Sequence, residues 1–324
     1  MDITLVTEKE LHTIPRKLFL YVYLILPVLL LVFLVDTFYF NSALRPYTGI
    51  EAITLPLFIF IFNLPHIIAS FFSFFDREYV SYYKTHLFLY LPGLLIATAV
   101  LLYVNFDLGV AFYLINDVWH GIKQKTGIAL ILGARPGRLH TVWTFLPFVT
   151  SALVYLYFLV PTVLPQILLD NISPIIFVGI GALFFVTILK IRQSVPEVRL
   201  YIFLVSSLIF LSYLFTLNGY IFFAILAFRF VHDISAFAFY ITHDYNRNKD
   251  TQKNLFYGLL SAIPLPVIIL TPLLAFLFAF IAQTMTHGIV IGYSIVVLLG
   301  MCHFYLESVM WKRDSLHRKQ VKVV

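Results

Sequence analysis

Long uninterrupted runs of apolar residues occupy most of the chain, and the charged residues lie mainly in short stretches between them. The run Leu18–Val35, for example, holds 18 residues without a charge. About 20 apolar residues in a helix span the hydrocarbon core of a bilayer. Such runs predict an all-α polytopic transmembrane bundle of about ten helices, forming a single integral membrane domain over residues 1–324. The ten segments are 17–40, 52–76, 84–106, 108–134, 139–163, 171–192, 198–217, 219–245, 254–282 and 286–311.

The fourth segment differs from the others because Lys123 and Lys125 lie inside it. A charged side chain within the bilayer is costly. We therefore expect this helix to end near Gly121, with residues 127–133 lying along the interface or re-entering the membrane. Prolines inside the fifth and ninth segments, Pro147 and Pro272 among them, predict kinks there.

The distribution of basic residues tests this topology. If the ten segments alternate in direction, 20 of the 22 lysines and arginines lie on one side of the membrane. The two exceptions are Arg45, in a loop on the opposite side, and Arg229, inside the eighth segment. Lysine and arginine are concentrated in cytoplasmic loops. We therefore expect both termini to be cytoplasmic, in a multi-pass protein of the inner or cytoplasmic membrane.

Composition agrees with this fold class. Apolar residues make up 61% of the chain and charged residues 12%, whereas soluble proteins carry about 45–50% and about 25%. This composition excludes a soluble enzyme and a nucleic-acid-binding module, so nucleic acid is not an expected partner. Cys302 is the only cysteine, which excludes an intrachain disulfide and a cysteine-based zinc site.

Seven of the ten histidines fall in the half of the predicted bundle that faces the cytoplasm. An ionisable residue in a membrane helix usually marks a function. Four of the seven are too deep for water alone to satisfy them, and all four lie on helices that run in the same direction. Imidazole ligands favour iron, copper or zinc. The four deep histidines are His66, His120, His232 and His303; the other three are His86, His140 and His243.

Neighbouring polar residues strengthen this pattern. His303 and Glu307 are four residues apart on one helix face, which suits a ligand with a carboxylate partner. Arg229 and Asp233 have the same spacing, so we expect them to pair with each other. His232 and His243 are eleven residues apart, about 16 Å along a helix, and the second therefore belongs to a separate layer at the cytoplasmic mouth.

Asp117 and Gln124 lie three residues before and four residues after His120, on the same face of its helix. Pro65 precedes His66 and can free a backbone carbonyl to accept an imidazole N–H. Three further residues also fall near the expected site: Tyr240, Tyr305 and Lys123.

These residues lead to a first hypothesis: a membrane-embedded metalloenzyme, a non-haem iron oxygenase or oxidoreductase that acts on a lipid or another lipophilic small molecule. Zinc or copper would also suit the ligands. In this hypothesis the four deep histidines bind the metal, and Asp233 and Glu307 are the candidate catalytic residues, as further ligands or as acceptors that orient the histidines. A redox partner protein would supply electrons where the reaction needs them.

The deep Pro65-His66 pair, together with single histidines spread over several helices, resembles the Brp/Blh-type membrane-embedded carotenoid dioxygenases. The resemblance implies a small all-helical membrane protein whose iron is held by histidines alone. It covers little beyond the second helix, where Ile67, Ile68, Ala69 and Ser70 follow the histidine in place of the glycine and acidic residue of that family. Only His66 can be carried over from it.

Two other functions fit the same residues. The first is a haem-binding electron carrier with axial histidines from two helices, such as His232 with His303 or His66. The second is a proton-coupled transporter with a relay of histidine, aspartate and arginine. The cluster occupies one side of the membrane only, which favours chemistry over passage. Each deep histidine could also serve only as a hydrogen-bonding contact between helices.

Overall fold

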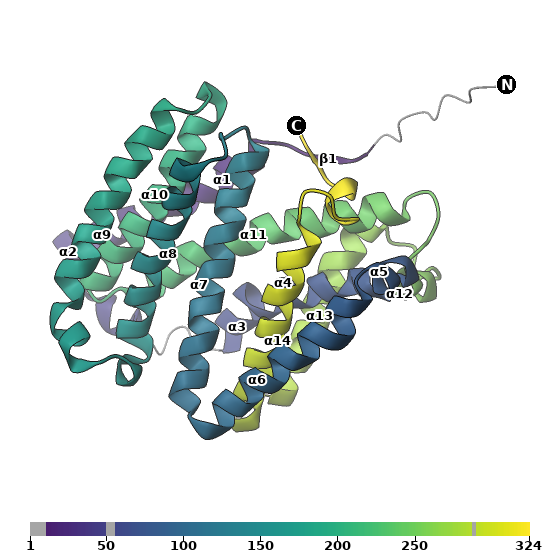
Figure 1. Ribbon diagram of the computed structural model, residues 1–324, viewed down its shortest axis with the longest axis horizontal. Helices are drawn as coiled ribbons and strands as arrows, with labels where there is room; N and C mark the ends of the chain where they lie inside the picture. Colours follow the sequence, from purple (N-terminus) through teal and green to yellow (C-terminus); the bar gives the residue numbers. More distant parts are fainter. Residues whose placement is uncertain (1–10, 50–55, 287–289) are drawn as a thin grey trace.

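A computed structural model describes residues 11–49, 56–286 and 290–324, which form a bundle of long helices (Figure 1). Among the described residues, eight helices are long and apolar enough to cross a membrane. The all-helical fold is therefore confirmed, and the helices are compatible with a multi-pass membrane protein. In a bilayer a helix satisfies its own backbone N–H and C=O groups, and this explains why the apolar runs become helices. The eight are Leu18–Tyr39, His86–Val104, Arg138–Leu159, Gln166–Arg192, Pro196–Leu217, Ile221–Asn248, Val267–Met285 and Gly292–Met310.

The second and fourth expected segments are helical but differ from these eight. The second is divided into α3 (Pro56–Phe62), α4 (Leu64–Phe72) and the 3₁₀ turn η4 (Ser73–Phe75). Asn63 separates α3 from α4, and Pro65 in the first turn of α4 has no N–H to continue the hydrogen-bond ladder of α3. The fourth expected segment corresponds to α7 (Phe106–Ile131).

The expected end of this helix near Gly121 is wrong, because α7 continues for ten more residues to Ile131. Lys125 causes the difference. Its side chain is 1% exposed, its Nζ donates to the Gly121 carbonyl (3.3 Å), and the same atom lies 3.6 Å from the ring centroid of Phe228. The amine thus has partners within the bundle, and the helix need not leave the apolar interior. The helix ends at Ile131, two residues before Gly133, whose φ of +109° favours glycine.

The bundle has two halves joined by α7 and α11 (Ile221–Asn248). In Figure 1, α2, α8, α9 and α10 lie to the left, whereas α4, α6, α13 and α14 lie to the right. Each half has its own cluster of buried apolar side chains, and residues of α11 belong to both clusters. The remaining long helices are α2 (Ile25–Tyr39), α6 (Leu91–Val104), α8 (Arg138–Leu159), α9 (Gln166–Arg192), α10 (Pro196–Leu217), α13 (Val267–Thr286) and α14 (Val290–Met310).

Short elements connect these helices. They are β1 (Thr13–Ile14), α1 (Leu18–Tyr21), η1 (Val22–Leu24), η2 (Arg45–Tyr47), α5 (Arg77–Tyr82), the π-helical η5 (His86–Tyr90), η6 (Pro161–Val163), α12 (Leu255–Leu259), η7 (Arg318–Gln320) and β2 (Lys322–Val323).

Both ends of the described chain fold onto the end of α11. Strand β1 pairs in parallel with β2, and the Arg16 N–H donates to the Val324 carbonyl (2.7 Å). Asn246 of α11 donates to the carbonyls of His12 and Gln320. We call this end of the bundle, where residues 311–324 fold, the tail end.

Candidate metal centre

Four helices bring four histidines together between the two halves of the bundle. His66 lies on α4, His120 on α7, His232 on α11 and His303 on α14, and none is more than 8% exposed. Each ring contacts two others edge to face, so the four form a closed ring. The centroid distances are 5.0 Å for His66–His232, 4.9 Å for His66–His303, 4.9 Å for His120–His232 and 5.0 Å for His120–His303. We call these four residues, with Asp233 and Glu307, the histidine centre.

Glycines allow the helices to approach closely here. A Cβ atom at Gly121 of α7 would lie 2.4 Å from the ring of Phe228 on α11. A Cβ at Gly300 of α14 would lie 2.6 Å from the ring of Tyr113 on α7. Small residues at such crossings are typical of membrane helices, because packing rather than the hydrophobic effect holds them together. The close approach places histidines from separate helices within contact of one another.

Two side chains outside the ring determine which nitrogen of a histidine carries its proton. Ser70 donates its hydroxyl hydrogen to the Ile67 carbonyl (2.6 Å), so its oxygen accepts from Nδ1–H of His303 (3.0 Å). Nδ1 of His232 donates to Oε1 of Gln124 (2.8 Å). In both histidines the proton is therefore on Nδ1, and Nε2 keeps a free lone pair, the form in which imidazole binds a metal.

Several nitrogen and oxygen atoms of the histidine centre have no hydrogen-bond partner. In the part of the chain that the structure describes, eleven buried side-chain nitrogen or oxygen atoms have no hydrogen-bond partner, and seven of them belong to the histidine centre. A buried polar atom without a partner costs about 1–3 kcal/mol. Seven such atoms converge on one point, and they are of the types that bind a cation. The seven are both imidazole nitrogens of His66, Nε2 of His120, His232 and His303, and both carboxylate oxygens of Asp233.

Two overlapping groups of these residues have the spacing of a metal site. His66, His232 and His303 form one group, and His303, His120 and Glu307 form the other. Within each group the ligand atoms lie within 4.8 Å of one another, whereas two ligands with bonds of about 2.1 Å lie at most about 4.2 Å apart on one ion. The residues present thus fit a transition metal after small inward shifts, and His303 is common to both groups.

The two carboxylates lie against different histidines. Oδ1 of Asp233 is 3.3 Å from Nδ1 of His66, and Oε2 of Glu307 is 3.4 Å from Nε2 of His120. Both are nearly buried, and the second oxygen of Glu307 accepts a hydrogen bond from the hydroxyl of Tyr240. Each acid can therefore bind a metal or take up a proton next to a ligand.

The expected pairing of Arg229 with Asp233 is wrong. Arg229 donates instead to Asp117 of α7, with 2.8 Å between Nη2 and Oδ2. The four-residue spacing along α11 would allow Arg229 to pair with Asp233, but its guanidinium forms the ion pair with Asp117 on the neighbouring helix. As a result Asp233 remains available to the histidine centre.

The three remaining histidines of this half do not join the centre. Nδ1 of His86 is bonded to the hydroxyl of Tyr305 (2.7 Å). His140 packs at the start of α8 against the ring of Trp143. His243 stacks on His317, with ring centroids 4.6 Å apart.

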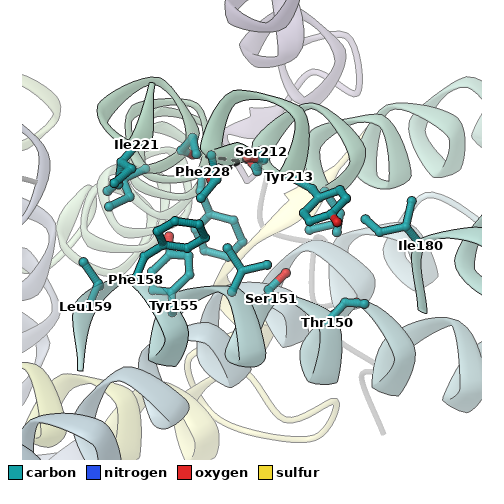
Figure 2. Close-up of a pocket in the computed structure, with 15 residues that line it drawn as sticks. Thr150, Ser151, Tyr155, Phe158, Leu159, Ile180, Ser212, Tyr213, Ile221 and Phe228 are labelled. Atoms are coloured by element: carbon teal, nitrogen blue, oxygen red, sulfur yellow. Dashed lines mark hydrogen bonds between the residues drawn. The ribbon is translucent and has the colours of Figure 1, made fainter. Parts of the chain in front are cut away.

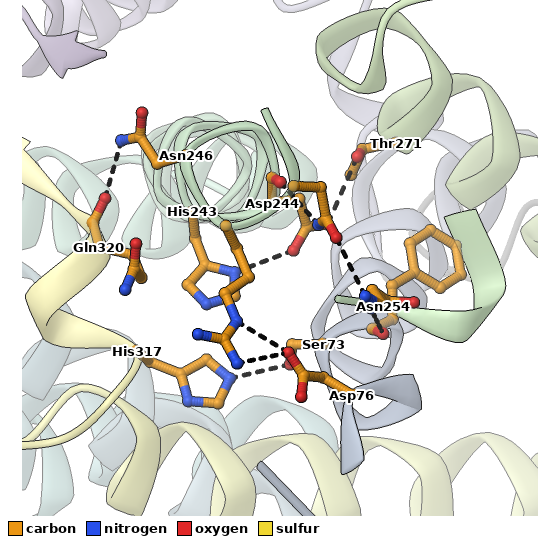
Figure 3. Close-up of polar contacts among 12 residues, drawn as sticks. Ser73, Asp76, His243, Asp244, Asn246, Asn254, Thr271, His317 and Gln320 are labelled. Carbon is orange, nitrogen blue, oxygen red and sulfur yellow. Dashed lines mark hydrogen bonds and ion pairs between the residues drawn. The ribbon is translucent and has the colours of Figure 1, made fainter. Parts of the chain in front are cut away.

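His243 and His317 form a second buried cluster at the tail end (Figure 3). Nδ1 of His243 donates to Asp244 (2.9 Å), and its Nε2 lies 2.9 Å from the hydroxyl of Tyr79. Nε2 of His317 lies 2.9 Å from Oγ of Ser73, and its Nδ1 lies 3.1 Å from the hydroxyl of Tyr83. Arg247 pairs with Asp76 (2.7 Å) beside them. We call this cluster the tail network; its members are Ser73, Asp76, Tyr79, Tyr83, His243, Asp244, Arg247 and His317.

Every imidazole nitrogen of the tail network is occupied. Ser73 donates to a backbone carbonyl (3.2 Å) and so accepts from His317, which leaves Tyr83 as the donor to the other nitrogen. Burial lowers the pKa of His317 well below its ordinary value, with positive charge on His243 and Arg247 acting in the same direction. Burial also raises the pKa of the Tyr83 phenol to about 12, so this donor keeps its proton. The two histidines of the tail network therefore have no free lone pair for a metal.

An apolar pocket lies one helical turn from the histidine centre (Figure 2). It lies among α8, α9, α10 and α11, and Phe228, four residues before His232, forms part of its wall. Its accessible space is about 30 Å³, enough for roughly one water molecule. A larger ligand enters it only if side chains such as Phe228 move.

Sequence reasoning missed two features of these sites. Ser70 lies four residues after His66 on the same face of α4, and this spacing could have indicated that it faces the centre. His317 lies in the tail after the last long helix, and no local pattern shows that the tail folds back onto α11. Gln124 was placed near His120 but contacts His232 instead.

A scan of the chain against protein-family models finds no match. Searches of curated proteins and of solved structures also find no match.

Proposed function

We propose that the protein is an integral membrane metalloprotein in which His66, His120, His232 and His303 bind one transition metal ion. The observation that carries this proposal is the convergence of four buried imidazoles with unpartnered nitrogens on one point. Interhelical hydrogen bonding alone would leave these nitrogens unsatisfied in a region without water. A bound cation accounts for the lone pairs and for the two nearby carboxylates together.

The same geometry argues against a haem. A haem iron takes four ligands from the macrocycle and leaves two axial positions for the protein. Here each of the four imidazoles contacts two others at about 5 Å between centroids, so they surround the point that a macrocycle would occupy. A proton-transfer path is also less well supported, because Arg229 is paired with Asp117 rather than with the centre.

We further propose that the metal is non-haem iron and that the protein is an oxidoreductase. When bound, iron with histidine ligands and open positions supplies oxygen and electron-transfer chemistry. The chain's own residues hold and orient it: Ser70 and Gln124 direct two Nε2 lone pairs inward. Asp233 and Glu307 can complete the ligand set or take a proton released during the reaction. Zinc and copper are the alternatives for the same ligands.

The substrate that suits this position is a lipophilic molecule, because the centre lies between helices whose other faces are apolar. The resemblance around Pro65 and His66 makes a carotenoid the first compound to test. The proposal includes ten spans, with α4 and α7 added to the eight apolar helices, both termini in the cytoplasm, and placement in the inner membrane. The basic residues at the tail end support that orientation.

The test is elemental analysis and an optical spectrum of the detergent-purified protein. The wild type is compared with His232→Ala and with His86→Ala, a matched control whose histidine lies outside the centre. We expect about one metal ion per chain and no Soret band in the wild type and in His86→Ala, and loss of the metal in His232→Ala. Folded wild-type protein without a stoichiometric metal would overturn the proposal. Oxygen uptake with added carotenoid or fatty-acyl lipid then tests the oxidoreductase activity.

A further inference from the structure

Glu307 connects the histidine centre with two redox-active side chains. Its Oε2 lies 3.4 Å from Nε2 of His120, and its Oε1 accepts the hydroxyl hydrogen of Tyr240. The indole of Trp311, one helical turn after Glu307, lies against the ring of Tyr240. One buried acid thus joins a candidate metal ligand and a tyrosine, and the tyrosine ring in turn contacts a tryptophan.

The aromatic rings continue from the centre toward the tail end. The ring of Tyr240 lies 6.5 Å from that of His303 and 5.8 Å from that of Trp311, centroid to centroid. Tyr240 is 2% exposed, whereas Trp311 is half-buried. The two residues therefore bridge the interior and the surface in short steps.

We propose that Tyr240 and Trp311 form a redox relay that passes single electrons between the tail-end surface and the metal of the histidine centre. The inference rests on the proposed metal site. Tyrosine and tryptophan are the side chains most readily oxidised by one electron. A phenol that loses an electron also releases its proton, and it needs a base at the hydroxyl to receive it.

The step balances with the groups present and one donor. With a metal bound, Tyr240 would supply one electron to it and pass its hydroxyl proton to Oε1 of Glu307, which would leave a neutral tyrosyl radical. Trp311 returns an electron to Tyr240 as the proton moves back from Glu307 to the phenolic oxygen. A soluble one-electron carrier of the haem or iron–sulfur class then reduces the tryptophan cation radical. The net result is one electron transferred from the carrier to the metal.

The surface around Trp311 suits such a donor. Lys312 and Arg313 follow it directly and are exposed. Two basic residues beside the entry point favour a carrier with an acidic contact surface, since charge complementarity steers association.

A buried tyrosine normally hydrogen-bonds to some partner, so packing alone would explain the Tyr240–Glu307 contact. The experiment therefore measures electron transfer directly. Tyr240→Phe and Trp311→Phe keep an aromatic ring at each position while removing the phenol or the indole. Tyr305→Phe is the matched control, because Tyr305 bonds to His86 and lies off the path.

The metal content of each purified variant is measured first, followed by the stopped-flow rate at which a reduced small haem protein reduces the oxidised metal. We expect metal content to be retained in all three variants. We expect reduction to slow by more than about tenfold in Tyr240→Phe and Trp311→Phe, equivalent to ~1.4 kcal/mol on the barrier, but not in Tyr305→Phe. Peroxide treatment should produce a tyrosyl radical signal by electron paramagnetic resonance that Tyr240→Phe lacks.

Unchanged reduction rates and an unchanged radical signal in metal-containing Tyr240→Phe and Trp311→Phe would overturn the relay while leaving the metal site intact. Absence of metal from the folded wild type would instead overturn the proposed function, and the relay with it. The two failures are therefore distinguishable by the first measurement.

Discussion

The histidine centre and the tail network contain the same kind of residue at similar burial, yet their hydrogen bonding is opposite. His232 and His303 each use Nδ1 to donate outward and leave Nε2 without a partner. His243 and His317 have partners at both nitrogens. Burial of a histidine therefore does not indicate a ligand. What distinguishes the histidine centre is that several imidazoles converge there with a ring nitrogen that has no hydrogen-bond partner.

The difference follows from the neighbours of each cluster. Tyr79, Tyr83 and Ser73 surround the tail network and supply hydroxyls that can donate or accept. Ser70 and Gln124 lie only on the outer side of the histidine centre, where they accept from Nδ1–H. The inner side faces other imidazoles, and Nε2 of His120, His232 and His303 has no hydrogen-bond partner there. The tail network satisfies its own imidazole nitrogens, whereas the histidine centre leaves these three without a hydrogen-bond partner.

The largest expected effect comes from His303→Ala, compared with His317→Ala. His303 belongs to both candidate ligand groups, so its loss should abolish metal binding, while His317→Ala should retain the metal. Elemental analysis of the two purified variants measures this. Equal metal content in the two variants would remove the distinction between the clusters.

The second effect is on stability. His317→Ala leaves Tyr83 without an acceptor and Ser73 without the N–H that donates to it, and it opens a space beside His243. We expect a loss of about 2–4 kcal/mol in the free energy of unfolding, seen as a lower thermal midpoint in detergent. Gln320→Ala, a partly buried change nearby that keeps the backbone bond to Asn246, is the control. A midpoint equal to that of the wild type would contradict a structural role for the tail network.

A smaller effect should come from the groups that orient the metal ligands. Ser70→Ala removes the acceptor of His303 Nδ1–H, and loss of such a partner lowers metal affinity by about 10–100-fold. Titration with a competing chelator measures the change. Ser73→Ala is the matched variant in the tail network, and its metal affinity should equal that of the wild type.

The smallest effect is the pH dependence of stability. His317 faces His243, Arg247, Tyr79 and Tyr83, and its pKa in the folded protein is lowered by burial. Below the unfolded value of about 6.5 the unfolded chain binds a proton that the folded chain does not, so stability falls as the pH decreases. The free energy of unfolding is therefore lower by roughly 1 kcal/mol at about pH 5.5. This loss is absent above about pH 7.5.

Thermal midpoints of the wild type and of His317→Phe at these two pH values provide the measurement. The drop on acidification should be smaller in the variant, which has no imidazole at this position. An equal drop in both proteins would assign the pH dependence to other groups.

Much of this organisation follows from the sequence alone. Apolar run length predicts helices because a bilayer demands internal backbone hydrogen bonding. Distance from the ends of each run gives the depth of a side chain. His66, His120, His232 and His303 were selected by depth, and they are the four that the fold brings together. The separate layer of His243, eleven residues along the same helix, was found in the same way.

The choice of partners was decided only by the tertiary structure. Arg229 pairs with Asp117 on α7 rather than with Asp233 on its own helix, and Lys125 remains inside the bundle over the ring of Phe228. His317 reaches the interior because the tail folds back onto α11. Depth is a local property, set by position along one helix. Partners depend on the rotation and crossing of several helices, which are set by close contacts such as those at Gly121 and Gly300.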